Sequence, residues 1–480
     1  MQILHISSEC YPAAKAGGLG DVVGALPKYL NKAGMQTAVI IPKYHTKWLM
    51  KQEYREVHRD TVRLHDIRID FAVQVVENAD LGYDLYVVDI PGKFDRNGVY
   101  LDENGRAYGD ELERYICFQQ AVLTWVRNFK VKPRILHCHD HHTGLIPFMV
   151  KYSPDFKALA NVPTVFTIHN GAYHGAFSWD NGHLLPYFDA QAKGLLEWGG
   201  IINPLAAGIK NSWAFTTVSP GYLNELRGNS NGLEDLINSE IGKSQGILNG
   251  IDNNVWNPKT DKYLQFHQKR SMDKFKEENR NEVLKHFRLS PELPIVTFIG
   301  RLAREKGADL LPNLIKTAIH SGIQANFMVL GTGDPGIHQV FHHMKHEYRG
   351  RFDAALEYNE GLARLLYAGS DFLLMPSRVE PCGLNQMYAC RYGTIPIVRS
   401  IGGLRDSIPD IGEAHGHGRG IRFDQFSIED AMLAVYRATE VFKDKAALKT
   451  IRKRIMAVDF SWENSAGAYM EIYNRLMGGS

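Results

Sequence analysis

Apolar runs in the first half of the chain alternate with polar or helix-like stretches. Ile3, Leu4 and Ile6 form a short apolar strand, a glycine-rich loop follows, and apolar residues then recur at helical spacing over 22–30. Strand, glycine-rich turn and helix are typical of the start of a doubly wound α/β fold. Polar or helical stretches separate the further strands, as a parallel sheet requires. These predicted strands are TAVIIP (37–42), LYVVDI (85–90), RILHCHD (134–140), PTVFTIHN (163–170) and AFTTVS (214–219).

The same alternation restarts after a polar stretch over residues 249–288 that is dense in Lys, Asn, Asp and Glu. This stretch predicts a hinge followed by a surface segment. A second series of strands then begins, and its first strand leads into a helix that begins near Ala308. The sequence therefore predicts an α/β protein of two Rossmann-like domains with a cleft between them. The strands of the second series are LPIVTFIGRL (293–302), ANFMVLGTGD (325–334), DFLLMPS (371–377) and TIPIVRS (394–400).

Length and composition narrow the class of protein. A chain of 480 residues is too long for one ordinary core. With 44% apolar and 22% charged residues, it is neither disordered nor fibrous. Lys and Arg (55) nearly balance Asp and Glu (53), without a block of like charge, which argues against a dedicated nucleic-acid or membrane-surface binder. We expect a neutral polymer or a small molecule as the ligand.

Cysteine usage and the apolar runs predict the compartment. The five cysteines are odd in number and form no CxxC pair, which suits reduced thiols in the cytosol. The first residues, MQILHISSECYPAAK, lack the basic leader of a signal peptide. No apolar run reaches about 18 residues, the length needed to cross a bilayer. We expect a cytoplasmic protein.

The glycine-rich segment KAGGLGD (15–21) is the first candidate binding element. Its glycines permit close approach to a phosphate at a helix N-terminus, and Lys15 can supply a full charge. The segment lacks the GxGxxG spacing of dinucleotide folds, and on the residues alone it fits a tight turn equally well. GKS (242–244) is not a P-loop, because Ile237 stands where that motif begins with Gly.

The cluster HCHDHH (137–142) offers four His and one Asp to a metal ion such as zinc. Neighbouring side chains on a strand point to opposite faces, so at most half of them converge without a bend. No HExxH, CxxC or DxD pattern supports a metal site, and we predict none. We favour a strand whose carboxyl end delivers Asp140 into a crevice, where open α/β sheets bind ligands. After the next strand, His169 and Asn170 are placed to hydrogen-bond a hydroxylated ligand or to cap the backbone.

Cationic and acidic residues follow two strands of the second series. Arg301 and Lys306 in GRLAREKG (300–307) can clamp a diphosphate without a metal, although a solvated basic turn has the same sequence. In SRVEPCGLNQ (377–386), Glu380 follows a strand that ends at Pro376, and residues 381–383 are predicted to open a helix. The amides near that helix start suit an anion, and Glu380 suits a neutral or cationic partner.

Taken together, these segments resemble the bacterial glycogen synthases and plant starch synthases, which extend an α-1,4-glucan from a nucleotide-glucose. The resemblance runs in order from Lys15 to Ala466 and so covers nearly the whole chain. It implies the GT-B fold, two Rossmann-like domains facing across a deep interdomain cleft, with domains at 1–248 and 249–458. It also implies a C-terminal helix within 459–480 that crosses back to the first domain. The matching segments are KAGGLGDVVGALP (15–27), HDHHTGL (139–145), GILNGID (246–252), GRLAREKG (300–307), LLYAGSDFLLMPSRVEPCGLNQ (365–386) and DFSWENSA (459–466).

The resemblance also implies roles for single residues. Arg301 and Lys306 neutralise the diphosphate leaving group, and Glu380 lies beside the transferred glucose. His169 binds the glucose hydroxyls, and Asp140 lies near the acceptor. The catalytic residues implied are Glu380, His169, Asp140, Arg301 and Lys306. The donor-binding residues implied are Lys15, Gly18, Asp21, Asn249, Tyr358, Gly383 and Leu384.

The implied activity is transfer of glucose from ADP-glucose to the non-reducing end of an α-1,4-glucan such as glycogen, with retention of configuration. No cofactor or metal is expected. Two residues depart from related patterns: His141 stands where the family commonly has Trp, and Tyr388 stands where the E-x7-E pattern of related retaining transferases has an acid. The alternatives are a UDP-sugar transferase of the same fold, a metallohydrolase built on 137–142, and a glucan-binding protein without catalysis. The sequence does not indicate an oligomeric state.

Overall fold

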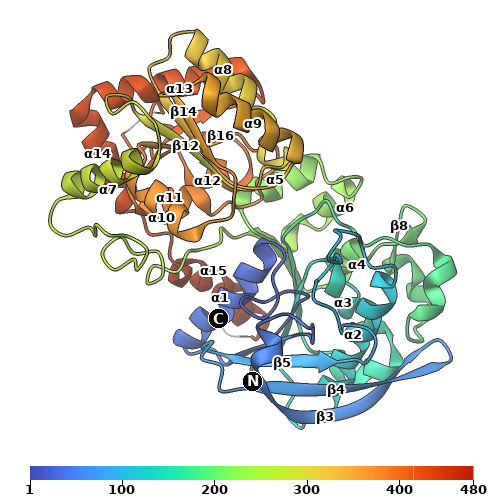
Figure 1. The fold of residues 1–480 in the computed structure, drawn as a ribbon. Coiled ribbons are helices and arrows are strands. Elements are labelled where there is room, and N and C mark those ends of the chain that lie inside the picture. The colour runs from blue at the N-terminus through green and yellow to red at the C-terminus, as the bar shows by residue number, and fades with distance from the viewer. Residues whose placement is uncertain (414–415, 479–480) are drawn as a thin grey trace. The chain divides into compact units, whose positions relative to one another are not determined.

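The computed structural model describes residues 1–413 and 416–478, which form two compact units (Figure 1). Positions 414–415 of the predicted second domain and 479–480 of the predicted third segment lie outside the described residues. Each unit has its own, largely parallel sheet, as the two series of predicted strands require. Unit 1 comprises Met1–Val218, Leu223–Ile247 and Trp462–Ser480, and unit 2 comprises Ser219–Tyr222 and Leu248–Ser461.

Unit 1 is built on a nine-stranded sheet in the order β11-β10-β7-β6-β1-β2-β5-β4-β3. The strands from β11 to β5 pair in parallel, and β4 and β3 extend one edge in antiparallel fashion. Every residue of β2 is buried, as expected for a parallel strand covered on both faces. The bounds are β1 (Ile3–Ile6), β2 (Thr37–Pro42), β3 (Glu53–Leu64), β4 (Ile67–Glu77), β5 (Asp84–Asp89), β6 (Ile135–His139), β7 (Thr164–Ile168), β10 (Ala214–Thr217) and β11 (Ser244–Gly246), with β8 (Glu197–Trp198) and β9 (Ile201–Ile202) forming a separate pair.

The C-terminal helix α15 packs against α1 in unit 1, and the two helices lie side by side in Figure 1. Trp462, Tyr469 and Tyr473 of α15 share one buried cluster with Val22 and Leu26 of α1. The chain thus returns to its first unit after completing the second. The helices of unit 1 are α1 (Gly18–Lys32), α2 (Glu111–Arg127), α3 (Ile146–Tyr152), α4 (Pro204–Asn211), α6 (Glu234–Ser239) and α15 (Trp462–Leu476), and α5 (Pro220–Gly228) has residues in both units.

Unit 2 is built on a six-stranded sheet in the order β14-β13-β12-β15-β16-β17, in which every neighbouring pair is parallel. The strands are β12 (Ile295–Ile299), β13 (Asn326–Leu330), β14 (Phe352–Ala355), β15 (Phe372–Met375), β16 (Ile395–Arg399) and β17 (Ile421–Phe423). The helices are α7 (Met272–His286), α8 (Leu311–His320), α9 (Pro335–Glu347), α10 (Glu360–Gly369), α11 (Asn385–Arg391), α12 (Gly402–Ser407), α13 (Ile428–Lys443) and α14 (Lys445–Met456).

The structure corrects the predicted helix starts. The glycine-rich segment is not a loop throughout, because α1 already begins at Gly18. The helix predicted near Ala308 begins at Leu311, and the helix predicted at 381–383 begins at Asn385. Gly307 and Gly383 stand before these two helices with φ of +71° and +73°, in the left-handed region that interrupts a right-handed helix.

Several elements were missed by the prediction, among them the helix α7 and the hairpin β3–β4. The polar stretch 249–288 is not all hinge and surface: its second half is α7, which packs against α10 and buries Phe275 and Val283. The hairpin β3–β4 also has no counterpart in the predicted strands. Most residues of β3 are exposed or half-buried and many are charged, so the strand lacks the apolar run that marks the parallel strands.

Candidate active site

The predicted site residues fall into two groups, one in each unit, and each group is described within its own unit. Unit 1 holds Lys15, Gly18, Asp21, Asp140 and His169. Unit 2 holds Asn249, Arg301, Lys306, Tyr358, Glu380, Gly383 and Leu384.

An ion pair between Lys306 and Glu380 forms the centre of the group in unit 2. The ammonium nitrogen of Lys306 lies 2.7 Å and 2.8 Å from the two carboxylate oxygens. Ser377 Oγ donates to Oε2 of the same carboxylate at 2.9 Å. Only 5% of Glu380 is exposed, and a buried carboxylate requires such partners to offset its lost hydration. The candidate catalytic residues Lys306 and Glu380 are therefore in direct contact.

Two loops hold this ion pair, one following β12 and one following β15. The backbone N–H of Arg378 donates to the carbonyl of Glu305 at 2.8 Å, and the Arg378 guanidinium bonds both carboxylate oxygens of Asp309. Gly307 lies so close to the second loop that a Cβ would stand 2.1 Å from the carbonyl oxygen of Pro376. Only glycine fits there, since the position combines a positive φ with backbone contact. The loops thereby fix Lys306 opposite Glu380.

Arg301 and Tyr358 are the most accessible members of this group. The guanidinium of Arg301 bonds the carboxylate of Glu305, four residues later, and 71% of the Arg301 side chain is exposed. Tyr358 is 84% exposed. Within the part of the chain that the structure describes, no hydrogen bond joins either residue to the Lys306–Glu380 pair. Sequence alone did not indicate that Arg301 already has an acidic neighbour.

Unpartnered polar groups lie in the segment that precedes α11 and at Asn249. The backbone N–H groups of Gly383 and Leu384 donate to no protein acceptor among residues 1–413 and 416–478. Gly383 needs its missing side chain, since a Cβ would stand 2.7 Å from Oε1 of Gln386. The side-chain oxygen of Asn249 is buried without a hydrogen-bond partner. These groups can still accept or donate hydrogen bonds to a polar ligand.

In unit 1, Lys15 pairs with Asp21 at 2.7 Å, with both side chains partly exposed. Asp21 lies in the first turn of α1, where a carboxylate also interacts favourably with the helix dipole. A second carboxylate, Glu9, is 3% exposed and accepts hydrogen bonds from the N–H groups of Ala16 and Gly17 at 2.6 Å and 2.8 Å. Glu9 therefore occupies two backbone amides of the glycine-rich segment, those of Ala16 and Gly17. No local pattern marks Glu9 in the sequence, because it acts on a loop that folds back onto it.

Asp140 and His169 follow neighbouring strands, β6 and β7, and they are in direct contact. One carboxylate oxygen of Asp140 accepts the backbone N–H of His169 at 2.7 Å. Asp140 itself has φ of +55°, a conformation that few residues other than glycine adopt. Burial raises the pKa of Asp140 to about 7, an effect that the donors from His169 and Asn170 offset only in part. Burial likewise lowers the pKa of His169 to about 3, so the imidazole is neutral at physiological pH.

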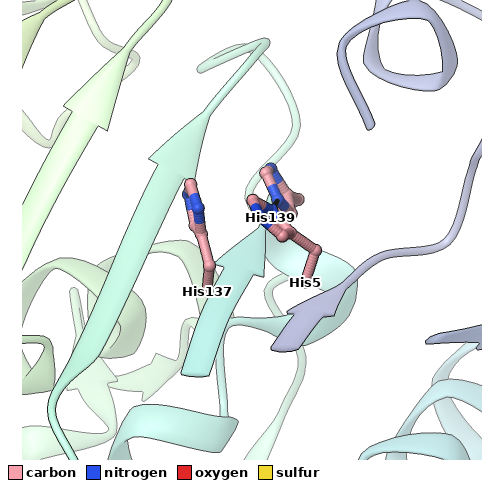
Figure 2. Close-up of side chains that lie close together, drawn as sticks. All are labelled: His5, His137 and His139. Carbon is pink, nitrogen blue, oxygen red and sulfur yellow. Dashed lines mark hydrogen bonds between the residues drawn. The ribbon is translucent and has the colours of Figure 1, made fainter. Parts of the chain in front are cut away.

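The histidine cluster forms a network with the protein rather than an open set of metal ligands. His137 and His139 point to the same side of β6 and lie beside His5 of β1 (Figure 2), with ligand atoms within 4.8 Å of one another. Both nitrogens of His137 are hydrogen-bonded, to Tyr473 and Thr167, each at 2.6 Å. Among the described residues a second group with metal-ligand spacing contains Glu111, His141 and His142.

Comparisons with known proteins identify the family. The sequence profile described as "Starch synthase catalytic domain" matches residues 2–239, and the profile "Glycosyl transferases group 1" matches residues 279–444. A glycogen synthase from Flavobacterium johnsoniae is 46% identical, and the alignment covers 99% of both chains. The chain belongs to the glycogen and starch synthase family.

Solved structures agree with the glycogen and starch synthase assignment. The catalytic domain of starch synthase IV from Arabidopsis thaliana, bound to ADP and acarbose, has a TM-score of 0.87 and 30% identity over 99% of each chain. A sucrose-phosphate synthase from Thermosynechococcus elongatus shares the fold alone, with a TM-score of 0.62 and 18% identity over 100% of this chain and 99% of that chain. The predicted GT-B fold with two Rossmann-like units and the predicted enzyme class, a hexosyltransferase, are confirmed. The metallohydrolase alternative does not fit this family.

Tyr388 and His141, the two residues that depart from related patterns, each lie against another ring. Tyr388 stacks on Trp256, with ring centroids 3.5 Å apart, so it packs as an aromatic residue. The ring of His141 lies 3.8 Å from that of His142, tilted by 36°, and a Cβ at Gly175 would stand 2.5 Å from the His141 ring. In the described part of the chain, no helix combines the length and apolar character needed to cross a bilayer.

Proposed function

We propose that this member of the glycogen and starch synthase family transfers glucose from ADP-glucose to the non-reducing end of an α-1,4-glucan, with retention of configuration. The observation that carries the proposal is the Lys306–Glu380 ion pair, held by two strand-end loops in a chain that aligns end to end with a glycogen synthase. ADP as the nucleotide is supported by the starch synthase IV structure, which contains ADP.

In this proposal, unit 2 binds the donor diphosphate. Lys306 and Arg301 supply positive charge, and the free N–H groups of Gly383 and Leu384 supply hydrogen bonds. Negative charge grows on the diphosphate as the bond to glucose C1 breaks, and fixed cations and amides stabilise that charge best in the transition state. Arg301 must exchange its contact with Glu305 for the phosphate, which its exposure permits.

Glu380 and the side-chain oxygen of Asn249 contact the transferred glucose in this proposal. The Glu380 carboxylate is paired with Lys306, so it presents a hydrogen-bond acceptor to an oxocarbenium-like glucose without being an isolated buried charge. The unpartnered oxygen of Asn249 is suited to a hydroxyl donor. We propose a front-face reaction, in which a phosphate oxygen of the leaving group takes the proton of the attacking acceptor hydroxyl.

Unit 1 supplies the remaining roles. His169 donates or accepts at a glucose hydroxyl, and Asp140 fixes its backbone from the acceptor side. Lys15 gives up its ion pair with Asp21 and approaches the donor phosphates and sugar. Gly18 has no side chain, so it leaves the N-terminus of α1 accessible to them. Tyr358 completes the donor pocket from an exposed position. We keep the cytoplasm as the proposed compartment, since all five cysteines are unpaired and buried.

A transfer assay tests this function. The protein is incubated with glycogen and radiolabelled ADP-glucose or UDP-glucose, and label is counted in the precipitated polymer. We expect incorporation from ADP-glucose well above that from UDP-glucose, and α-anomeric proton signals for the new linkages by NMR. Glu380→Gln, which keeps the shape of the side chain, is the matched control and should incorporate little label. Preference for UDP-glucose would favour the alternative UDP-sugar transferase, and no incorporation from either donor contradicts the proposal.

A further inference from the structure

A row of three buried imidazoles runs from β1 through β6 to the end of β7. Nδ1 of His5 lies 3.1 Å from Nε2 of His139, and Nδ1 of His139 lies 3.0 Å from Nε2 of His169. His5 and His139 are completely buried, and His169 is 8% exposed. Figure 2 shows the first two rings of this row beside His137, which bonds to other partners.

The geometry of the row couples the protonation of its members. Burial lowers the pKa of His5 and of His169 to about 3 and that of His139 well below its usual value, so all three rings are neutral and each carries one N–H. Each contact joins an Nδ1 to an Nε2, and a hydrogen bond needs one proton between them. If Nδ1 of His5 donates, His139 must also be protonated at Nδ1, and so must His169. The opposite direction would protonate all three rings at Nε2.

The buried end of the row selects between these two states. Nε2 of His5 has no hydrogen-bond partner and is inaccessible to water. The first direction leaves a lone pair unpartnered there, and the second leaves an N–H unpartnered. Buried N–H groups without an acceptor are the rarer case in native proteins. The first direction is therefore favoured.

We propose that His5 and His139 are positioning residues that hold His169 in its Nδ1–H tautomer and so make it a hydrogen-bond donor to the sugar. Asp140 fixes the backbone of His169 at 2.7 Å, while His139 fixes the ring through Nε2. Nδ1 of His169 has no hydrogen bond to any described residue, so it is the nitrogen left for a ligand. A protonated Nδ1 donates to a hydroxyl oxygen and cannot act as a general base. This inference rests on the proposed function for its ligand, but the tautomer does not depend on it.

The tautomers are measured directly. The full-length protein is labelled with ¹⁵N-histidine, and long-range ¹H–¹⁵N correlations report which ring nitrogen of each histidine carries the proton; single-histidine variants provide the assignments. We expect Nδ1–H for His5, His139 and His169 alike. A proton on Nε2 of His169 overturns the proposal, whatever the activity of the enzyme.

Kinetics test the positioning role. His139→Leu removes both contacts of the central ring, and we expect kcat to fall tenfold or more with little change in the KM for ADP-glucose. His137→Leu is the matched control, because it removes an equally buried imidazole from the same strand but leaves the row intact. His139→Asn restores a donor near the position of Nδ1 and should recover much of the loss. An equal loss in His139→Leu and His137→Leu overturns the positioning role.

His169→Ala separates failure of this inference from failure of the proposed function. If that variant transfers glucose normally, the role proposed for His169 toward the sugar is wrong, and the NMR result still decides whether the row sets its tautomer. If His169→Ala is inactive and His139→Leu is fully active, the site residue is right and the positioning by His139 is wrong.

Discussion

Replacing Lys306 with methionine separates two functions of one ammonium group. Met retains much of the apolar stem and removes the charge that lies 2.7 Å and 2.8 Å from the carboxylate oxygens of Glu380. In the proposed reaction the same charge stabilises the departing diphosphate. The loss of one such transition-state contact costs about 3–4 kcal/mol, or roughly a hundred- to thousandfold in kcat. Donor affinity should fall much less, because this charge develops mainly in the transition state.

The substitution also leaves a carboxylate that is 5% exposed with Ser377 as its remaining described side-chain partner. Removal of one member of a buried pair costs about 3–5 kcal/mol, and the 30% exposure of the Lys306 side chain reduces this to about 1–3 kcal/mol through solvent screening. For a unit of this size, each kcal/mol lowers Tm by roughly 2–4 °C. We therefore expect the melting of unit 2 to fall by several degrees.

The double variant Lys306→Met/Glu380→Gln distinguishes the two effects. Neutralising Glu380 removes the uncompensated charge, so the double variant should regain most of the lost stability while transfer stays abolished. Ser377→Ala, which removes only the 2.9 Å hydrogen bond to Glu380, is the mild control. The measurements are calorimetric melting, kcat and KM with ADP-glucose and glycogen, and titration of ADP into each folded variant. Turnover of Lys306→Met within threefold of wild type would refute the reasoning.

Three further predictions concern metal, pH and the acceptor. Transfer should persist after EDTA treatment, because Lys306, Arg301 and backbone amides neutralise the diphosphate; activity that EDTA removes and Mg²⁺ or Mn²⁺ restores contradicts this. Burial raises the pKa of Asp140 to about 7 from its usual value near 4, so between those pH values the folded protein binds more protons than the unfolded one. The contribution of Asp140 to the free energy of unfolding therefore falls as pH rises from 4 to 7, by at most about 4 kcal/mol. Asp140→Asn should therefore raise Tm relative to wild type more at pH 8 than at pH 5, and an equal difference at both pH values would show that Asp140 ionises normally. His141→Trp, which restores the residue common in the family, should change the preference for glucan length while ADP affinity stays within twofold; an unchanged acceptor profile with malto-oligosaccharides would remove His141 from the acceptor side.

Much of the fold follows from the sequence because parallel strands are buried on both faces. Runs such as TAVIIP lie in the interior at every position, as a parallel strand covered on both faces requires. β3 failed this criterion, since one face of the edge hairpin meets solvent. The helix starts shifted because Gly307 and Gly383 adopt left-handed conformations. Glycine in the sequence permits such a conformation but does not require it.

The candidate site was predictable where neighbours in sequence carry the chemistry, and less so where contacts join distant segments. Glu380 and Lys306 each follow a strand, which indicated a ligand site, but their ion pair depends on the contact of Gly307 with Pro376. Glu9 and His5 have no motif at all. His5 matters because the sheet order places β1 beside β6. Glu9 matters because the loop that follows β1 returns residues 16–17 to its carboxylate.

The histidine cluster shows that residue type and local spacing do not predict the hydrogen-bond partners of each ring. HCHDHH contains the ligands of a zinc site, and strand alternation does bring His137 and His139 to one side. What decides their role is the partner that each nitrogen meets: Tyr473 and Thr167 for His137, His5 and His169 for His139. Tyr473 comes from the last helix, more than 300 residues away in the chain. Folding therefore places these imidazoles in a neutral hydrogen-bonded network, and that network ends at His169, whose Nδ1 bonds no described residue.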